Sequence, residues 1–255
     1  LHRYFSHRCF KTSRVFQFIL AIISTTSNQR GPLWWAATHR HHHIYSDKKE
    51  DVHSPVQHGF WHSHIGWLHI KDNSKLNLNL VKDFKKFPEL LWLEKTFFYF
   101  FILFGTLVTL LGAYLEVNHP SLGTNAYQFF SWGVVLSSLC CNHMTLGINS
   151  ILHTFGKKRY ITTDESKNVW WFFPGLGAQW HNNHHKYPYS ARSGHTFWEV
   201  DPTFTLFKIL GSIGLIWDIK SVHLKDGQVV KSTLYKKEVQ NKTEKFDRGS
   251  LEPQI

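Results

Sequence analysis

Two long apolar runs stand out in the pattern of hydrophobic and polar positions. Residues 97–117 carry a single charge, Glu116, and residues 126–148 carry none. Each run approaches the ~20 apolar residues that a helix needs to cross a bilayer. Neither run has a polar stripe, which argues against the alternative of a buried hairpin in a soluble core. The pattern therefore predicts two transmembrane helices joined by the short turn at residues 118–125.

Shorter patterns describe the rest of the chain. Residues 15–24 are apolar but too short to span a membrane, so we expect them at the interface or over a site. T-D-E-S-K-N at 163–168 looks like a helix start, and residues 206–222 have the mixed pattern of an amphipathic interfacial helix. From residue 224 onward the chain is polar, typical of a loosely held tail that is helical at most in part. We assign residues 1–223 to one domain and residues 224–255 to this tail.

The charge distribution predicts an orientation in the membrane. The mean hydropathy is mildly negative, which taken alone suggests a soluble protein, but it averages over the two apolar runs. Of the 29 Lys and Arg residues, 14 precede residue 97, 15 follow residue 148 and none lies between. The positive-inside rule then places both flanks in the cytoplasm. The net charge of +11 suits anionic lipid headgroups or an acidic substrate, and no nucleic-acid recognition motif occurs.

Histidines supply the candidate chemistry. Nine of them form four clusters: H-R-Y-F-S-H, H-R-H-H-H, the last residue of N-S-I-L-H, and H-N-N-H-H. Helix positions i, i+3 and i+4 lie within ~100° of one face, so each H-x-x-H-H box is expected to present three imidazoles to one point. His41 falls on the other face and is predicted not to be a ligand. The candidate ligands are His2, His7, His39, His42, His43, His153, His181, His184 and His185.

Nine imidazoles exceed what one metal ion can hold, and they suit two ions with four or five ligands each. The ligand type fits iron, zinc, copper or nickel and leaves the metal open. His2 and His7 are five residues apart, which suits ligands of two different ions or ligands at a helix end. The remaining histidines, His53 and His223 among them, are expected to be ordinary surface or core residues. All four clusters lie in the flanks, so the site is expected to face the cytoplasm.

A metal transporter or metal buffer is a different interpretation of the same histidines. Transport would place the ligands inside the membrane spans. Only His143 lies within one of the two predicted spans. The distribution of the histidines therefore favours a catalytic metal centre.

The boxes and their surroundings resemble those of a known enzyme family. H-R-Y-F-S-H-R, T-H-R-H-H-H-I-Y-S-D, N-S-I-L-H-T-F-G and W-H-N-N-H-H-K-Y-P flank a membrane hairpin in this order. From His2 to about Asp218 the chain is similar to the membrane-bound acyl-CoA desaturases of the stearoyl-CoA delta-9 type. The resemblance implies an all-α integral membrane protein, in which a transmembrane hairpin carries a cytoplasmic helical cap with a histidine-rich dimetal site. In the family another hairpin precedes the first box, so we expect that this N-terminal hairpin is missing here.

The resemblance also implies a cofactor and an activity. Two iron ions would be held by the nine histidines and by a water bound to Asn149, with zinc able to replace iron in overexpressed protein. The implied reaction is O2-dependent formation of a cis double bond, at delta-9, in a saturated acyl chain carried by coenzyme A. Because the chain has no haem or iron–sulfur motif, a separate cytochrome b-type protein or ferredoxin must donate electrons. A membrane fatty-acid or alkane hydroxylase stays open as the alternative, although the residues flanking the boxes favour a desaturase.

Three residues are expected to bind the acyl chain. Thr145 precedes His153 by eight residues on the same helical face, ~12 Å deeper toward the bilayer, and Trp35 lies one turn before His39. In the family, residues at these two positions line a bend in the acyl tunnel with a glutamine that corresponds to Gln29. We expect Gln29, Trp35 and Thr145 to form a hydrogen-bonded kink.

The chain departs from the family pattern at two positions. Ala178 stands in G-A-Q-W, where an acidic residue behind the metal is usual. Ala37 stands where animal members have an arginine that helps to hold coenzyme A. The sequence therefore does not identify the acidic residue behind the metal. It also does not identify the acyl carrier, for which acyl carrier protein and lipid remain alternatives to coenzyme A.

Overall fold

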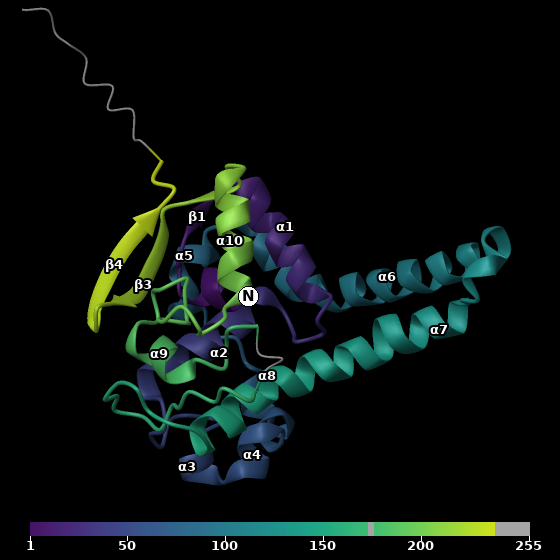
Figure 1. Ribbon diagram of the computed structural model, residues 1–255. Coiled ribbons are helices and arrows are strands. Elements are labelled where there is room, and N and C mark those ends of the chain that lie inside the picture. Colours follow the sequence, from purple (N-terminus) through teal and green to yellow (C-terminus); the bar gives the residue numbers. More distant parts are fainter. Residues whose placement is uncertain (173–175, 238–255) are drawn as a thin grey trace, which may run out of the picture.

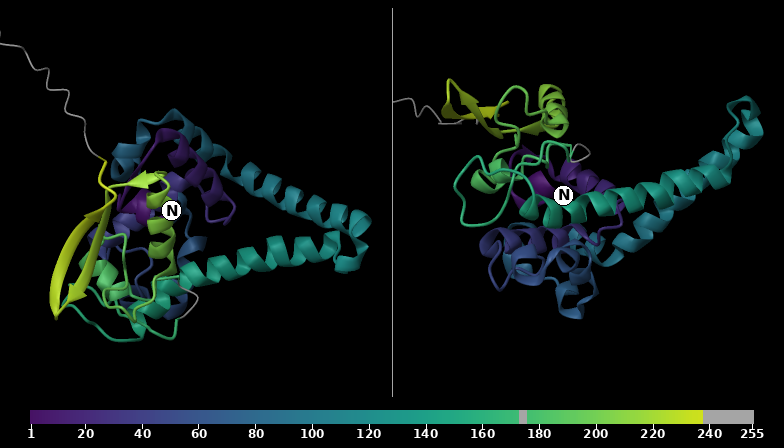
Figure 2. Two further views of the ribbon diagram at one scale, coloured as in Figure 1. Left: turned by 45° about the horizontal axis from the view of Figure 1, so that its top comes forward. Right: turned by 60° about the horizontal axis from the view of Figure 1, so that its bottom comes forward.

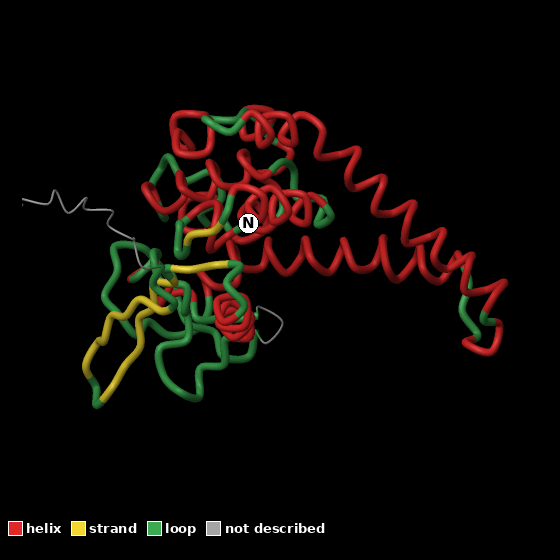
Figure 3. Tube along the Cα trace, turned by 90° about the horizontal axis from the view of Figure 1, so that it is seen from above, coloured by secondary structure: helices red, strands yellow, loops and turns green. Residues whose placement is uncertain are grey.

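The computed structural model describes residues 1–172 and 176–237 and is mostly helical (Figure 1). A long hairpin of two helices projects from a cap of short helices and loops (Figure 2), and the N-terminus lies inside the cap near the base of the hairpin. Seen from above, the longer pair of strands lies on the side of the cap away from the helical hairpin (Figure 3). The fold thus separates an apolar projection from a compact polar end.

The hairpin agrees with the two predicted spans. Its first arm is α6 (Pro88–Asn118), and its second arm is the continuous run of α7 (Ala126–Phe130), the π-helix η6 (Ser131–Leu136) and α8 (Ser137–Thr154). Both arms are long and apolar enough to cross a membrane, and few of their residues are buried. The short 3-10 helix η5 (Pro120–Leu122) lies in the turn between them. Each arm extends past its predicted span and enters the cap.

Glycines allow the two arms to approach closely. A Cβ atom at Gly112 would lie 2.7 Å from Phe129 Cβ, and one at Gly133 would lie 2.8 Å from Val108 Cγ1. Both distances are shorter than van der Waals contact, so no larger side chain fits without separating the helices. Small residues of this kind are the usual contacts between membrane helices.

The cap is built from short elements. The first histidine box forms the π-helical turn η1 (His2–Ser6), and the second lies on α2 (Pro32–Tyr45), whose first turn contains Pro32. The Glu94 carboxylate of α6 accepts the free N–H groups of Leu33 and Trp34, at 2.8 and 3.2 Å, and so joins α2 to the hairpin. The other cap helices are α1 (Arg14–Thr25), α3 (Pro55–His58), α4 (Phe60–His64), η2 (Gly66–His69), η3 (Lys71–Ser74), η4 (Leu78–Val81), α5 (Lys82–Lys85), α9 (His181–Lys186) and α10 (Pro202–Ser212).

Two small antiparallel sheets depart from the all-α expectation. β1 (Lys11–Thr12) pairs with β2 (Ile216–Trp217), and β3 (Ile219–Lys225) pairs with β4 (Gln228–Leu234). Asp226 and Gly227, both at positive φ, form the two-residue turn that such a hairpin requires. The helix expected over 206–222 therefore ends at Ser212, and the expected domain boundary at residue 223 falls inside β3. Residues 238–255 of the expected tail lie outside the described residues.

The main apolar core lies beside the first box. Buried residues from η1, α2, α5, α6 and the strands pack together there, among them Phe5, Leu33, Phe84, Leu90 and Ile216. Because these elements come from distant parts of the chain, the core fixes η1 against α2. It thereby sets the positions of the histidines on both elements.

Candidate metal centre

Nine histidine rings converge where η1, α2, the end of α8 and α9 meet. They form two groups, and within each group the ring nitrogens that could hold an ion lie within 4.8 Å of one another. Neither group contains His41, whose ring lies against Tyr45. The first group consists of His2, His7, His39, His43 and His184, and the second of His42, His153, His181 and His185. These are the nine candidates that the spacing predicts.

The spacing predicted that each H-x-x-H-H box would present its three rings to one point, and this prediction was wrong. On α2, His39 and His43 belong to the first group and His42 to the second, whereas α9 places His184 in the first and His181 and His185 in the second. Consecutive helical residues are ~100° apart, so positions i+3 and i+4 fall on opposite sides of position i. Each box therefore lies between the two groups and contributes to both.

Nitrogen spacing in the first group matches a ligand sphere. Its Nε2 atoms form a chain in which neighbours are 2.9–3.0 Å apart: His2 to His184, His184 to His43, His43 to His39, and His39 to His7. Imidazole nitrogens bound at about 2.0–2.1 Å to one ion, at right angles, lie about 2.9 Å from each other. The spacing therefore fits five rings around one cation.

Carboxylates orient three rings of the second group. The Nδ1 atoms of His42, His153 and His185 lie 2.9, 2.9 and 2.8 Å from carboxylate oxygens of Asp51, Asp47 and Asp164 respectively. A ring that donates its Nδ1–H to a carboxylate keeps a lone pair on Nε2. Consistent with a missing cation partner, the buried Nε2 of His185 has no hydrogen-bond partner among the described residues.

Burial favours the neutral form of seven of the nine rings, because it is the largest influence lowering the pKa of His2, His7, His39, His43, His181, His184 and His185. The pKa falls to about 3 at His7, where neighbouring histidines lower it further, and to about 4 at His185. For Asp47, burial would raise the pKa, but hydrogen bonds from His153 and Ser54 bring it to about 2. The pKa of Asp164 is also lowered, by its hydrogen bond with His185 against the effect of burial. Neutral imidazoles with ionised aspartates behind them are a donor set for a cation.

Arg40 connects the first two boxes. Its guanidinium donates to the backbone carbonyls of Phe5 and Ser6 at 2.7 and 2.8 Å, between His2 and His7 in the sequence. It also donates to Leu80 O at 2.8 Å and pairs with both carboxylate oxygens of Asp83. Since Arg40 follows His39 on α2, this single side chain fixes the first box against the second.

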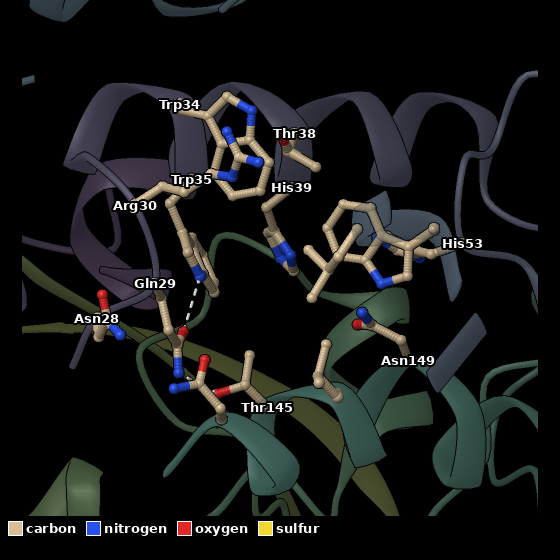
Figure 4. A pocket seen from close by; sticks show the side chains of 14 residues that line it. Asn28, Gln29, Arg30, Trp34, Trp35, Thr38, His39, His53, Thr145 and Asn149 are labelled. Atoms are coloured by element: carbon tan, nitrogen blue, oxygen red, sulfur yellow. Dashed lines mark hydrogen bonds between the residues drawn. The ribbon is translucent and has the colours of Figure 1, made fainter. Parts of the chain in front are cut away.

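Two cavities adjoin the histidines. One, of about 380 Å³, is lined by rings of both groups and by apolar residues of α1, α8 and α10; the other, of about 190 Å³, lies beside α2 and α8 (Figure 4). Trp35, His39, Thr145 and Asn149 line both. The two cavities therefore share a wall at the first histidine group.

A hydrogen-bonded chain crosses this shared wall. Trp35 Nε1 donates to Gln29 Oε1 at 3.1 Å, and Gln29 Nε2 donates to Thr145 Oγ1 at 2.9 Å (Figure 4). The Trp35 ring stacks on His39, with centroids 5.1 Å apart. The structure thus brings together the three residues singled out in the sequence and places them against a candidate ligand.

Comparison with known proteins decides the family. The sequence profile of the fatty acid desaturases matches residues 1–203. The chain belongs to the fatty acid desaturase family. An sn-1 stearoyl-lipid 9-desaturase of Anabaena variabilis is 36% identical over 86% of this chain and 76% of its own length. An acyl-CoA C20 Delta5-desaturase of Anemone leveillei is 34% identical over 86% of this chain and 67% of its own length.

A Delta-9 acyl-lipid desaturase of Arabidopsis thaliana is also similar, at 33% identity over 86% of this chain and 68% of its own length. These comparisons confirm the resemblance and the class: the chain is an oxidoreductase of a desaturase family. They do not favour a hydroxylase. The two apolar helices and the family together indicate a membrane protein.

Some residues of this desaturase centre were missed in the sequence. Asp47, Asp51 and Asp164 carry no motif of their own, although the first two follow His43 at helical spacings of four and eight residues. His53, expected to be an ordinary residue, is 3% exposed and lies with its ring 4.5 Å from that of His42. Its Nδ1 is 3.5 Å from Asp51 Oδ1, so His53 packs directly behind the second group.

Proposed function

We propose that this protein is an O2-dependent fatty acyl desaturase, in which two iron ions are held by the nine histidines and by a water on Asn149. The observation that carries the proposal is the convergence of nine buried or half-buried histidines into two groups, the first of which has its nitrogens spaced as the ligands of one ion are. Zinc also accepts imidazole ligands, generally with higher affinity than ferrous iron, and could replace iron in overexpressed protein. Asn149 supports the water role by lining both cavities beside His39.

Methylene hydrogens have no useful acidity, so no acid–base pair could remove them, and a pair of iron ions with O2 supplies the oxidant when bound. The residues of the chain do the remaining work. The imidazoles offer nitrogen lone pairs, while Asp47, Asp51 and Asp164 hold three rings through Nδ1. The chain's own motifs include no redox group, so we propose a separate cytochrome b-type protein or ferredoxin as electron donor.

The proposed substrate is a saturated fatty acyl chain that lies in the two cavities and bends at Gln29, Trp35 and Thr145. The apolar lining supports an acyl chain, and the hydrogen-bonded wall supports a fixed bend. A bend beside the ions would select the carbons to be oxidised, because a straight tunnel would let the chain slide by whole methylenes. We propose delta-9 regiochemistry and a cis product. Relatives at similar identity are named for acyl-CoA, for stearoyl-lipid and for an acyl-carrier-protein substrate, so coenzyme A is the proposed carrier, with membrane lipid and acyl carrier protein as the alternatives.

We further propose that the protein spans the membrane with its metal centre in the cytoplasm. The absence of Lys and Arg between residues 97 and 148, against 29 in the flanks, supports this orientation. The cap would then face the soluble electron donor. The anionic headgroups of the membrane lipid would attract its net positive charge.

Lipid analysis after expression in a desaturase-deficient host tests the proposed reaction. We expect one new monounsaturated positional isomer, and none from the His184→Ala variant. Hydroxylated fatty acids in place of the unsaturated product would instead support the hydroxylase.

The tunnel assignment has its own test. Replacing Trp35 with Ala should widen the bend, lower the rate and spread the double bond over neighbouring carbons, and Thr145→Val should act in the same direction by removing one hydrogen bond. If both variants formed one sharp product at the normal rate, the tunnel assignment would be wrong, although the metal assignment could stand.

A further inference from the structure

Outer carboxylates are distributed unevenly between the two histidine groups. Three of the four rings in the second group, those of His42, His153 and His185, are bonded through Nδ1 to an aspartate. Within the described part of the chain, no ring of the first group is hydrogen-bonded to a carboxylate. The two groups therefore differ in what lies behind their ligands as well as in the number of ligands.

Asp47 joins three separate segments behind the second group. Its Oδ2 accepts from His153 Nδ1 at 2.9 Å and from the backbone N–H of Glu165 at 2.7 Å, and its Oδ1 accepts from Ser54 Oγ at 2.6 Å. The residue has φ 60°, a left-handed conformation that Asp tolerates better than most residues. This backbone geometry directs the carboxylate to the end of α8.

Asp51 and Asp164 complete the same layer. Asp51 is fully buried, and its Oδ2 accepts from His42 Nδ1 at 2.9 Å and from the backbone N–H of Asp47 at 3.0 Å. Asp164 accepts from His185 Nδ1 at 2.8 Å and from Ser166 Oγ at 2.5 Å. Each of the three carboxylates is thus anchored by a second partner and cannot turn away from its histidine without losing that bond.

Three anchored carboxylates have two effects on an ion in the second group. They fix the Nδ1–H tautomer and the orientation of each ring. They also place a negative charge on the far side of each ligand ring from the cation. Partners of this kind typically change metal affinity 10–100-fold. The first group receives neither effect from a carboxylate, and its box is fixed by the cation of Arg40.

We propose that the two ion positions are inequivalent, with Asp47, Asp51 and Asp164 acting as positioning residues for the four-histidine position alone. This rests on the proposed pair of ions in the centre. Loss of any one carboxylate loosens one ion and leaves the other in place. The dimetal centre accordingly passes through a form with one ion, in the five-histidine group, when the outer layer is disturbed.

Zinc titration of the purified chain in detergent tests the proposal without turnover. Wild-type protein competes with a chromophoric chelator for two zinc ions, and we expect Asp164→Asn to weaken one binding step by about 10–100-fold while the other step stays within a factor of about three. The unchanged step shows that the variant is folded. Asp72→Asn is the matched control, because Asp72 is exposed and its ion-pair partner among the described residues is Lys75 alone, and both steps should be unchanged. Asp164→Glu, which keeps the charge, should fall between wild type and Asp164→Asn.

Zinc anomalous scattering from crystals of Asp164→Asn should show the remaining ion among His2, His7, His39, His43 and His184. Equal weakening of both steps, no weakening of either, or a remaining ion beside His185 would overturn the inequivalence. Each of those results would leave the proposed desaturase standing, since the wild-type chain would still hold two ions. A hydroxylated product from a chain that shows the selective loss would overturn the proposed reaction and leave the inequivalence intact.

Discussion

Replacement of Arg40 by Met should detach the first histidine box from α2. Methionine keeps the apolar stem and removes five hydrogen bonds: two to Asp83, and one each to the carbonyls of Phe5, Ser6 and Leu80. The carbonyls of Phe5 and Ser6 lie between His2 and His7 in the sequence. Without Arg40, the rings of His2 and His7 are therefore no longer held in position relative to His39 and His43. We expect a chain that folds less stably and holds the ion of the five-histidine group weakly.

The magnitude follows from the exposure of the partners. The Asp83 carboxylate is 35% exposed and also lies 3.7 Å from Arg8, so its pair with Arg40 contributes only ~0–1 kcal/mol. The guanidinium itself is 19% exposed. Hydrogen bonds from a charged donor are worth ~1.5–3 kcal/mol each, but water can reach partly buried carbonyls once the arginine is gone. A total of about 2–4 kcal/mol is therefore reasonable for the loss of stability.

If ~3 kcal/mol of this loss is coupled to metal binding, affinity at the five-histidine group falls ~100-fold. Zinc titration measures that fall, and thermal unfolding in detergent measures the stability. Arg14→Met is the matched control, since Arg14 makes a bidentate pair with Glu89 on the surface, and neither quantity should change. Two zinc ions bound by Arg40→Met as tightly as by wild type would refute the role given to Arg40.

Three further predictions concern other parts of the fold. Gly112→Val should overpack the membrane hairpin against Phe129 and reduce the free energy of unfolding by ~1–3 kcal/mol, which a lower apparent Tm would show. Leu110→Val on the exposed face should leave the Tm unchanged. His53→Ala, which removes a ring packed on His42, should weaken zinc at the four-histidine group in the same titration, and His223→Ala should leave it unchanged. Burial, and next to it Arg159, lowers the pKa of His195 to about 3, so the unfolded chain gains a proton below pH ~6.5 that the folded chain does not. Stability should then fall by ~2 kcal/mol from pH 6.5 to pH 5 through this residue. The Tm of His195→Gln should therefore change less over that interval than the Tm of the wild type, and an equal change in both would show that the pKa of His195 is not lowered.

Local patterns predicted the parts of the fold that depend on local geometry. The two membrane helices follow from runs of apolar residues, and the nine histidines follow from spacing along helices. The spacing of His2 and His7 allowed two interpretations: ligands of two different ions, or ligands at a helix end. The structure places His2 and His7 in one group because η1 ends at Ser6, before the second ligand.

The β-hairpin at the end of the described chain was missed although its signal is present. Asp226-Gly227 lies between two stretches rich in β-branched residues, which is the strongest short-range signal of a hairpin. The polar and charged residues from Leu224 onward made the segment look like a loosely held tail. The first half of β3 is nevertheless buried, at Ile219, Ser221 and Val222, and this burial depends on contacts that no local pattern contains.

The outer carboxylates could not be predicted for a related reason. Asp164 lies in T-D-E-S-K-N, which has the composition of a helix start, but the segment is a loop that brings its carboxylate to His185 of α9. Its partner is chosen by the approach of two segments in three dimensions. The sequence departure at Ala178 gave no indication of which carboxylates would lie behind the histidines.

The division of each box between two groups explains why these outer residues matter. An H-x-x-H-H helix must contribute to both positions, since its i+3 and i+4 rings lie on opposite sides of position i. Changes that move α2 or α9 as a whole therefore disturb both positions together. Asp164 bonds a ligand of one position only, His185, and Arg40 holds the backbone between two ligands of the other, His2 and His7. Residues of this kind are the places where the chain can set the two positions independently. Separate control of two metal positions thus rests on residues outside the histidine boxes.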